Sequence, residues 1–269
     1  MPAPNSRGVE SRSFYDLDRH PLGQAELARL RERNRAAAGA RLWRWVGHQP
    51  GMRTLDAGCG PGHTTEALAA DAHPAEVVGI DFGERILAVA ESVRTASPLK
   101  NFRFVQGDIG NLPLAEGSFD FVWMQMVLQH LADPQAALRE ACRVLQGAGR
   151  LGIMEAATAV PRFYPPEAEL EAYFREAARA QREYGADPEI AGRLEEMVRR
   201  AGFARCRSRA IAQAASGEQL AWNLGYLRSR GTMAGLSQEA VERAAGALER
   251  AERAGTIMET RWAVLGASK

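Results

Sequence analysis

Residues 54–65 read TLDAGCGPGHTT, and the pattern of this segment sets the expectation for the whole chain. An apolar run reaches Asp56, after which Gly58, Gly60 and Gly62 occupy alternate positions ahead of a helical stretch. Glycine lets the backbone turn sharply and come close to a ligand. Free N–H groups at the start of a helix can also meet an anionic group. A strand, a glycine loop and a helix in this order predict a nucleotide-type binding loop.

The loop departs from the dinucleotide-binding fingerprint in its spacing. Gly62 comes one residue early, and His63 stands where the third glycine of that fingerprint would be. We expect His63 to pack beside the loop or to lie exposed, and Cys59 to be a small spacer without a redox partner. Asp56 ends the strand, where a carboxylate would repel a pyrophosphate but suit an ammonium group.

Two further acids follow the next two apolar runs. Asp81 ends EVVGID (76–81), where a carboxylate can accept hydrogen bonds from both hydroxyls of a ribose. Asp108 ends FRFVQGD (102–108) and can accept the amino group of adenine while Ile109 packs on the ring. Each acid by itself could be a helix cap. Together with the glycine loop, they predict a pocket for a nucleoside that carries positive charge.

Outward from this loop, short apolar runs alternate with helical stretches as far as residue 156. Strands alternating with helices predict right-handed crossovers and a mostly parallel sheet that is covered on both faces. Asp133-Pro134 is typical of a helix start. The predicted strands are 53–58, 76–81, 102–108, 119–126 and 150–155, and the predicted helices are 63–72, 83–96, 134–146 and a stretch from 22 to about 48.

The second half of the chain is mostly helical. Asp187-Pro188 predicts one helix start, and Ser216 with Gln219 fits a capping box at another. The predicted helices are 168–184, 188–201, 217–229 and 237–254, and the predicted strands are 206–213 and 256–266. We predict an N-terminal helical cap segment over 1–48 and a second domain over 49–269 with helical cap insertions at about 157–203 and 216–255.

Composition excludes several classes of protein. The 269 residues are 46% hydrophobic with a net charge of +1, which argues against a disordered chain and against binding of nucleic acid through phosphate neutralisation. Three separated cysteines without a CxxC pair argue against a disulfide framework and a zinc site, so no metal is expected. Neither a signal peptide nor a membrane span is predicted, and we expect a soluble, cytoplasmic monomer or homodimer.

Five segments resemble the class I S-adenosylmethionine-dependent methyltransferases over residues 50–156. They are TLDAGCGPGHTT, VVGIDFGERIL, VQGDIGNLP, FDFVWMQMVLQHLADP and ALREACRVLQGAGRLGIME. The resemblance implies a Rossmann-like, doubly wound α/β fold with seven strands, of which the last is antiparallel. The usual Pro-Gly-Gly turn before the fifth strand is Gly147-Ala148-Gly149 here, which affects no ligand assignment. More loosely, SFYDLDRHPLGQAELARLRERN and PRFYPPEAEL resemble small-molecule methyltransferases related to the quinone-biosynthesis type.

The resemblance implies S-adenosylmethionine as the cofactor. The glycine loop would hold its methionine part, the acid at Asp81 its ribose, and Asp108 with Ile109 its adenine. Gln125 or Met126 should line the side that bears the methyl group. The cofactor-binding candidates are Asp56, Gly58, Cys59, Gly60, Gly62, Asp81, Phe82, Asp108, Ile109, Gln125 and Met126.

Three residues are candidates for a catalytic role. His130 follows the fourth strand and could act as a base or fix its loop. Glu155 ends the fifth strand and could bind a cationic substrate, stabilise a carbocation, act as a base or be a structural carboxylate. Tyr15 resembles N-terminal aromatics of the family that contact the cofactor, and otherwise packs in the cap.

The aromatic residues of the predicted cap favour a small, partly apolar substrate over a macromolecule. They are Phe163, Tyr164, Tyr173, Phe174, Trp222 and Tyr226. Oxygen or nitrogen is the expected methyl acceptor, and carbon is a close rival. Methylation of RNA or protein and binding of the cofactor without transfer stay as further alternatives. The arginines between Glu26 and Trp45 are interpreted as a solvated helix face, with recognition of a phosphorylated substrate as the alternative.

Overall fold

The computed structural model describes residues 41–217, 220 and 223–269. Its sheet has eight strands in the order β3-β2-β1-β4-β5-β8-β6, with β7 paired to β8 outside this path. The strands are β1 (Thr54–Ala57), β2 (Val77–Asp81), β3 (Phe102–Gln106), β4 (Phe119–Gln125), β5 (Leu145–Ala156), β6 (Arg162–Tyr164), β7 (Arg205–Ala215) and β8 (Ile257–Ser268).

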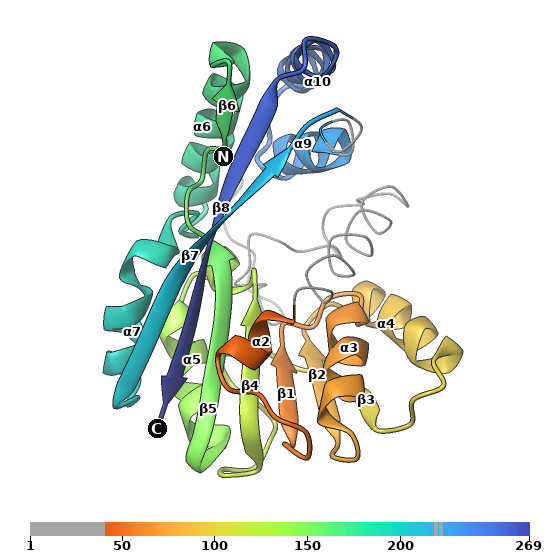
Figure 1. Ribbon diagram of the computed structural model, residues 1–269, viewed down its shortest axis with the longest axis vertical. Coiled ribbons are helices and arrows are strands. Elements are labelled where there is room, and N and C mark those ends of the chain that lie inside the picture. Colours follow the sequence, from red (N-terminus) through yellow and green to blue (C-terminus); the bar gives the residue numbers. More distant parts are fainter. Residues whose placement is uncertain (1–40, 218–219, 221–222) are drawn as a thin grey trace, which may run out of the picture.

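Helices cover both faces of this sheet and form a separate group beyond one end of it (Figure 1). They are α2 (Leu42–Trp45), α3 (His63–Ala72), α4 (Glu84–Ala96), α5 (Pro134–Val144), α6 (Ala168–Glu183), α7 (Leu194–Arg200), α9 (Asn223–Met233) and α10 (Gln238–Arg253). Two short 3-10 helices are η1 (Leu128–His130) and η2 (Ile190–Arg193). The predicted α/β class with a doubly wound, mainly parallel sheet and an antiparallel strand is confirmed.

Strand β8 departs from the parallel arrangement. Strands β1 to β5 pair in parallel, whereas β8 runs antiparallel to β5 from Ala156↔Trp262 to Arg150↔Ser268. The earlier part of β8 extends past the end of β5 and pairs with β6, which the sequence does not predict. β6 has only three residues and is flanked by prolines, so its sequence shows no alternation that would indicate a strand. It therefore forms only through its pairing with β8.

Helix starts agree with the sequence where a side chain caps the backbone. Asp133 Oδ1 accepts the N–H of Ala136 at 3.0 Å, as predicted for α5. Asp187 instead accepts the N–H of Glu189 and pairs with Arg193, so η2 intervenes and α7 begins only at Leu194. Ser237 caps α10 by accepting the N–H of Ala240 at 3.2 Å. The capping box at Ser216 and Gln219 lies partly outside the described residues.

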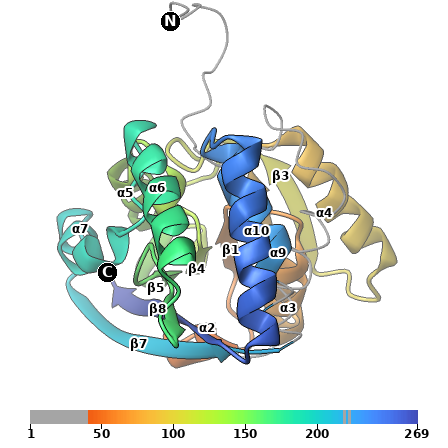
Figure 2. The same cartoon turned by 90° about the horizontal axis from the view of Figure 1, so that it is seen from above.

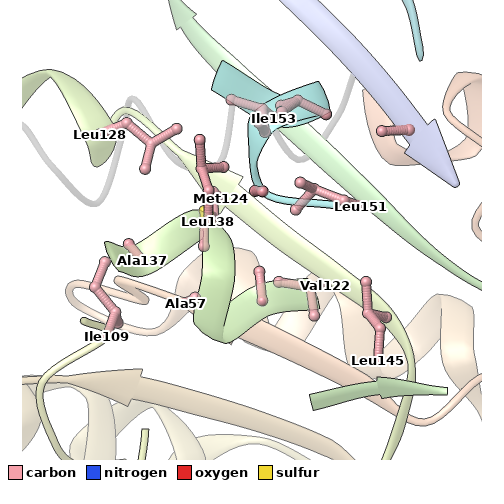
Figure 3. Close-up of a cluster of buried hydrophobic side chains, with 14 of the residues drawn as sticks. Ala57, Ile109, Val122, Met124, Leu128, Ala137, Leu138, Leu145, Leu151 and Ile153 are labelled. Atoms are coloured by element: carbon pink, nitrogen blue, oxygen red, sulfur yellow. The ribbon is translucent and has the colours of Figure 1, made fainter. Parts of the chain in front are cut away.

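The apolar side chains form three clusters, one on each face of the sheet and one in the cap. The cluster of the first face joins the strands to α5, η2 and α7, and Figure 3 shows its centre. The labelled members are Ala57, Ile109, Val122, Met124, Leu128, Ala137, Leu138, Leu145, Leu151 and Ile153. The opposite cluster joins Trp43 and Leu68 to Phe121 and Trp123. Each sheet face is therefore buried, which explains the near-continuous apolar runs of its strands.

Helices α6, α9 and α10 make up the cap, and they lie beyond the carboxyl ends of the parallel strands (Figures 1 and 2). They share their own core, which contains Phe163, Leu170, Phe174 and Leu248. Helix α7 belongs to the predicted cap insertion at 157–203, but its side chains pack into the core on the sheet. The division of the chain into two domains stays a prediction.

The segment before β1 is fastened to α3 through a buried carboxylate. Asp71 is 6% exposed and accepts the Trp43 indole N–H at 2.9 Å and the Arg44 Nε–H at 2.8 Å. Arg41 pairs with the same carboxylate. Arg41 and Arg44 belong to the arginine-rich stretch between Glu26 and Trp45, and both form an ion pair with Asp71. Most of the helix predicted over 22–48 lies outside the described residues, as does Tyr15. Across the described part of the chain, no helix is long and apolar enough to cross a membrane.

Replacing Asp71 with alanine should lower the free energy of unfolding by about 1–3 kcal/mol, because the buried Trp43 N–H loses its acceptor. Urea denaturation followed by circular dichroism measures this change. The control is Glu91→Ala, which removes an exposed ion pair with Arg94 within α4 and should alter stability by less than about 0.5 kcal/mol. Equal effects of the two substitutions would contradict the role given to Asp71.

Candidate functional site

The glycine loop between β1 and α3 folds back over the end of β2. Gly58, Gly60 and Gly62 have φ values of 78°, 55° and 83°, in the left-handed region that favours glycine. The N–H groups of Gly58 and Cys59 donate to the carbonyl of Ile80 at 2.8 and 3.0 Å. The sequence pattern thus forms a tight turn at the carboxyl edge of the sheet.

The three glycines differ in what surrounds them. A Cβ atom at Gly58 would lie 2.5 Å from a methyl carbon of Val127, and one at Gly62 would lie 2.5 Å from the ring of Phe104. A Cβ atom at Gly60 would meet nothing within 4 Å. Gly58 and Gly62 therefore allow close packing, whereas the space beside Gly60 leaves the backbone accessible to a ligand.

Asp81 links the glycine loop to the turn that follows β2. Its Oδ2 accepts the N–H of Gly60 at 3.0 Å, and its Oδ1 accepts the N–H of Gly83 at 3.1 Å. A carboxylate offers roughly four lone-pair positions, so it can accept more hydrogen bonds than these two. The geometry is consistent with the predicted hydrogen bonds to two ribose hydroxyls.

Asp56 is 1% exposed at the end of β1. Burial raises the pKa of this carboxyl to about 7, against a hydrogen bond from the Thr65 hydroxyl that favours the ionised form, and the nearby Asp81 raises it further. The Thr65 Oγ1 donates to Asp56 Oδ2 at 2.7 Å. A cation beside Asp56 would favour its ionised form, in agreement with the predicted affinity for an ammonium group.

The remaining cofactor candidates after β2 and β3 fall into two environments. Asp108 is exposed, and its Oδ1 accepts the N–H of Gly110 at 2.7 Å. Ile109 is buried against the first sheet face. Phe82 is half-buried, and its carbonyl accepts from Gln106 Nε2 at 3.0 Å. Burial raises the pKa of the Cys59 thiol, which keeps it neutral as a spacer in the loop.

Gln125 and Met126, at the end of β4, lie in different environments. Gln125 is buried, and its Oε1 accepts the indole N–H of Trp123 at 3.2 Å, which turns it toward the second sheet face. Met126 has a φ of 57°, and its N–H donates to the carbonyl of Met154 at 2.7 Å. Such a backbone conformation is uncommon for a residue other than glycine and occurs often at functional sites.

Glu155 holds the loop that follows β4. It is fully buried, and its Oε1 accepts the N–H groups of Val127 at 2.9 Å and Leu128 at 2.6 Å. The carboxylate thus caps the start of η1, which ends at His130. Of the roles considered for Glu155, these contacts favour the structural one, and its chemical role stays a prediction.

The cap fixes the same loop from the other side. Gln181 of α6 donates through Nε2 to the carbonyl of Gln129 at 3.1 Å, and the N–H of Asp187 donates to that carbonyl at 3.1 Å. The loop that carries His130 is therefore held both by Glu155 of β5 and by Gln181 of α6. Gln181 was not singled out from the sequence, because nothing local marks an amide that acts on a residue far away in the chain. Thr65 lies within the segment 54–65, but nothing there marks its hydroxyl as the partner of Asp56.

The aromatic residues of the cap lie together. Phe163 and Phe174 stack at 6.3 Å between ring centroids, and Phe174 stacks with Tyr226 at 6.2 Å. Tyr173 meets Phe174 edge to face at 5.6 Å. Tyr164 is 48% exposed and lies outside this group. Trp222 lies outside the described residues.

The site fits the sulfonium nucleoside predicted from the sequence. Open space beside Gly60 admits the ligand to the backbone, Asp81 can accept from hydroxyls, and Asp56 offers a carboxylate that a cation would ionise. In the described ranges 41–217, 220 and 223–269, no group of three or more His, Cys, Asp or Glu could hold a metal ion.

Comparison with known proteins identifies the family of the domain. A family model described as a methyltransferase domain matches residues 48–202. Demethylmenaquinone methyltransferase of Lactococcus lactis subsp. lactis is 32% identical over 179 residues, which cover 61% of this chain and 70% of that enzyme. The enzyme of the same name from Staphylococcus aureus is 39% identical over 116 residues, which cover 43% of this chain. The match spans 47% of that staphylococcal enzyme.

A solved structure shares the fold at low sequence identity. The YcgJ protein of Bacillus subtilis has a TM-score of 0.61 with 18% identity, and the match covers 87% of this chain and 99% of that one. Identity at this level shows the arrangement of elements alone.

Replacing Asp81 with alanine should weaken binding of S-adenosylhomocysteine on the order of 10²-fold, because the ribose hydroxyls lose a charged acceptor and the Gly60 N–H loses its partner. Isothermal titration calorimetry measures the affinity. Glu76→Ala removes an exposed carboxylate near the opposite end of the same strand and should leave the affinity unchanged. An unchanged affinity in the Asp81 variant would remove Asp81 from the site.

The pKa of Asp56 predicts a pH dependence of ligand binding. Below pH 7 this carboxyl is mostly protonated in the free protein, so a cationic ligand must expel a proton to obtain the carboxylate. The affinity for S-adenosylhomocysteine, whose ammonium group stays charged, should rise about tenfold from pH 6 to pH 8. Asp56→Asn should bind more weakly and with little dependence on pH. The same slope in both proteins would show that Asp56 does not meet the ammonium group.

Proposed function

The chain belongs to the methyltransferase-domain family, whose model covers more than half of its length, and from this premise we propose that it methylates a small, partly apolar metabolite. It is an S-adenosylmethionine-dependent enzyme, as the sequence predicts. The observation that carries the proposal is the hydrogen bond by which Asp81 holds the glycine loop. The buried Asp56 precedes this loop, and the cap above the loop has an aromatic core of its own.

The cofactor, when bound, supplies a methyl group on a positively charged sulfur. The residues of this chain that would hold it are the loop from Gly58 to Gly62, Asp81 at the ribose, and Asp108 with Ile109 at the base. Asp56 supplies a negative charge close to the loop, which offsets the positive charge of the ligand.

Positioning is the main contribution that the protein makes to methyl transfer. Such transfer is an in-line displacement, and correct alignment of two reactants can supply roughly 7–11 kcal/mol of the barrier. The loop from Val127 to His130 is fixed by Glu155 and by Gln181 of α6. The cap therefore does more than cover the site, because one of its helices sets the position of the loop beside the acceptor.

We propose His130 as the base for an oxygen or nitrogen acceptor. It is half-buried at the end of η1, on a loop that both the sheet and the cap hold in place. A general base removes the proton of the acceptor as the new bond forms, and this contributes about 10²–10⁴-fold to the rate. Glu155 supports the loop through the N–H groups of Val127 and Leu128 and acts as a positioning residue.

A carbon acceptor on a quinone-type ring is the second candidate. It is favoured by the similarity to two enzymes named demethylmenaquinone methyltransferase, from Lactococcus lactis and Staphylococcus aureus. The half-buried ring of Tyr226, which is backed by the stacked ring of Phe174, would suit a flat aromatic acceptor.

The test is an assay with S-adenosylmethionine and panels of phenols, amines and quinols, followed by mass spectrometry. We expect one acceptor class to gain the mass of one methylene group with matching release of S-adenosylhomocysteine. His130→Ala should lower kcat about 10²-fold or more on a phenol or amine while the cofactor affinity stays within a few-fold. Gln135→Ala, a change on the first turn of α5, is the control and should alter neither.

Two outcomes would contradict the proposal. Cofactor binding without a methylated product from any panel would show a binding protein rather than a transferase. An unaltered kcat in the His130 variant on a phenol or amine would leave His130 as a structural residue and would favour the carbon acceptor.

A further inference from the structure

Arg230 lies within α9 and is 8% exposed. Its Nη1 donates to the hydroxyl of Tyr226 at 2.6 Å. Its Nε and Nη2 are buried, and among the residues that the structure describes neither has a hydrogen-bond partner. Buried donors without acceptors are rare in folded proteins and call for a reason.

The two nitrogen atoms share one edge of the guanidinium group. Nε–H and one Nη2–H point in parallel from this edge, and they form the fork that binds both oxygens of a carboxylate. The third nitrogen, Nη1, is already used by Tyr226. The side chain is thus held by its far end and presents a complete bidentate fork.

No acidic side chain compensates this charge within the described part of the cap. Two carboxylates on the other cap helices bind other arginines: Glu242 of α10 pairs with Arg228 at 2.9 Å, and Glu169 of α6 pairs with Arg250 at 2.8 Å. The rings of Phe174 and Tyr226 lie 5.8 Å from the Arg230 guanidinium carbon, and rings at this distance offer only weak attraction to a cation.

An unpaired buried charge lowers stability, so its presence points to a ligand that completes it. A buried charge that lowers the stability of the free protein is retained where ligand binding requires it. Both nitrogen atoms are shielded from bulk water, so an anion that reaches them is desolvated and strongly attracted.

Helix α9 places this fork in the cap. Figures 1 and 2 show α9 beneath α10, on the side of the cap that faces the carboxyl ends of β1 and β4. The Tyr173 hydroxyl of α6 donates to the carbonyl of Leu227, which fixes α9 against α6. The fork is therefore fastened to the same helix whose Gln181 holds the loop of His130.

We propose that Arg230 binds a carboxylate group on the methyl acceptor. This inference rests on the proposed function, because it assigns the substrate that the cap encloses. The partly exposed ring of Tyr226, which is hydrogen-bonded to Arg230, contacts the aromatic or apolar part of that molecule, and the fork fixes its orientation beneath the cap. The acceptor is accordingly an aryl or comparably apolar carboxylic acid that carries the group to be methylated.

The experiment compares ligands that share a naphthyl ring and differ in the group attached to it. The full chain, saturated with S-adenosylhomocysteine, is titrated with 1-naphthoate, 1-naphthamide and 1-naphthyl phosphate, and dissociation constants are measured by calorimetry. The wild type should bind naphthoate at least about tenfold more tightly than naphthamide. Arg230→Met, which keeps the length of the side chain but removes the fork, should lose this preference.

Arg228→Met on the same helix is the matched control, because Arg228 is exposed and pairs with Glu242. It should keep the preference of the wild type. Thermal denaturation provides a second measurement, in which Arg230→Met should raise the Tm of the ligand-free protein because a buried unpaired charge is removed.

Three results would overturn the proposal: equal preference for naphthoate in the wild type and in Arg230→Met, no preference in the wild type, or tighter binding of the phosphate ester than of the carboxylate. A lower Tm in Arg230→Met with an unchanged preference would show a structural arginine. Failure of the proposed function is seen separately, since it would leave every acceptor unmethylated whatever the naphthoate measurements give.

Discussion

The pairing of β8 joins the two parts of this molecule. β7 is bonded to one side of β8 along nearly its whole length. On the other side, the later half of β8 pairs with β5 and its first residues pair with β6, whose Phe163 belongs to the core of the cap. A backbone ladder of this length fixes both position and direction, because a shift by one residue would turn every side chain to the opposite face. The cap consequently stands over the carboxyl ends of the parallel strands, where the glycine loop and its acids lie (Figure 1).

Buried polar groups organise the site, and in most cases each has a partner. Asp71 compensates Trp43 and Arg44, Asp56 accepts from Thr65, and Glu155 accepts from two backbone N–H groups. Asp71 and Glu155 connect elements that are far apart in the sequence, and Asp56 connects β1 to the helix that follows it. Arg230 differs from them, because the edge of its guanidinium faces no acceptor among the described residues. In the free protein this arrangement lowers stability, and a bound anion would relieve it.

Much of the site could be predicted because it is local in the sequence. The glycine loop needs glycine for its positive φ values, and Asp56, Asp81 and Asp108 each follow a recognisable apolar run. The boundaries of α3 and the cap of α5 also agree with prediction, since propensity and capping act within a few residues. Where the sequence is misleading, a competing contact explains the difference, as when Asp187 pairs with Arg193 and α7 starts later.

The sequence by itself therefore determined the fold class, the position of the glycine loop and the family to which the chain belongs, because each follows from residues close together along the chain. The tertiary structure alone decided which face Gln125 turns to, that Glu155 supports the loop of His130, that α7 packs on the sheet and that β6 adds to β8. It also separated Arg230 from the other arginines. In a chain where nearly every basic residue is arginine, only burial and the lack of a partner distinguish one of them, and both depend on contacts between distant segments.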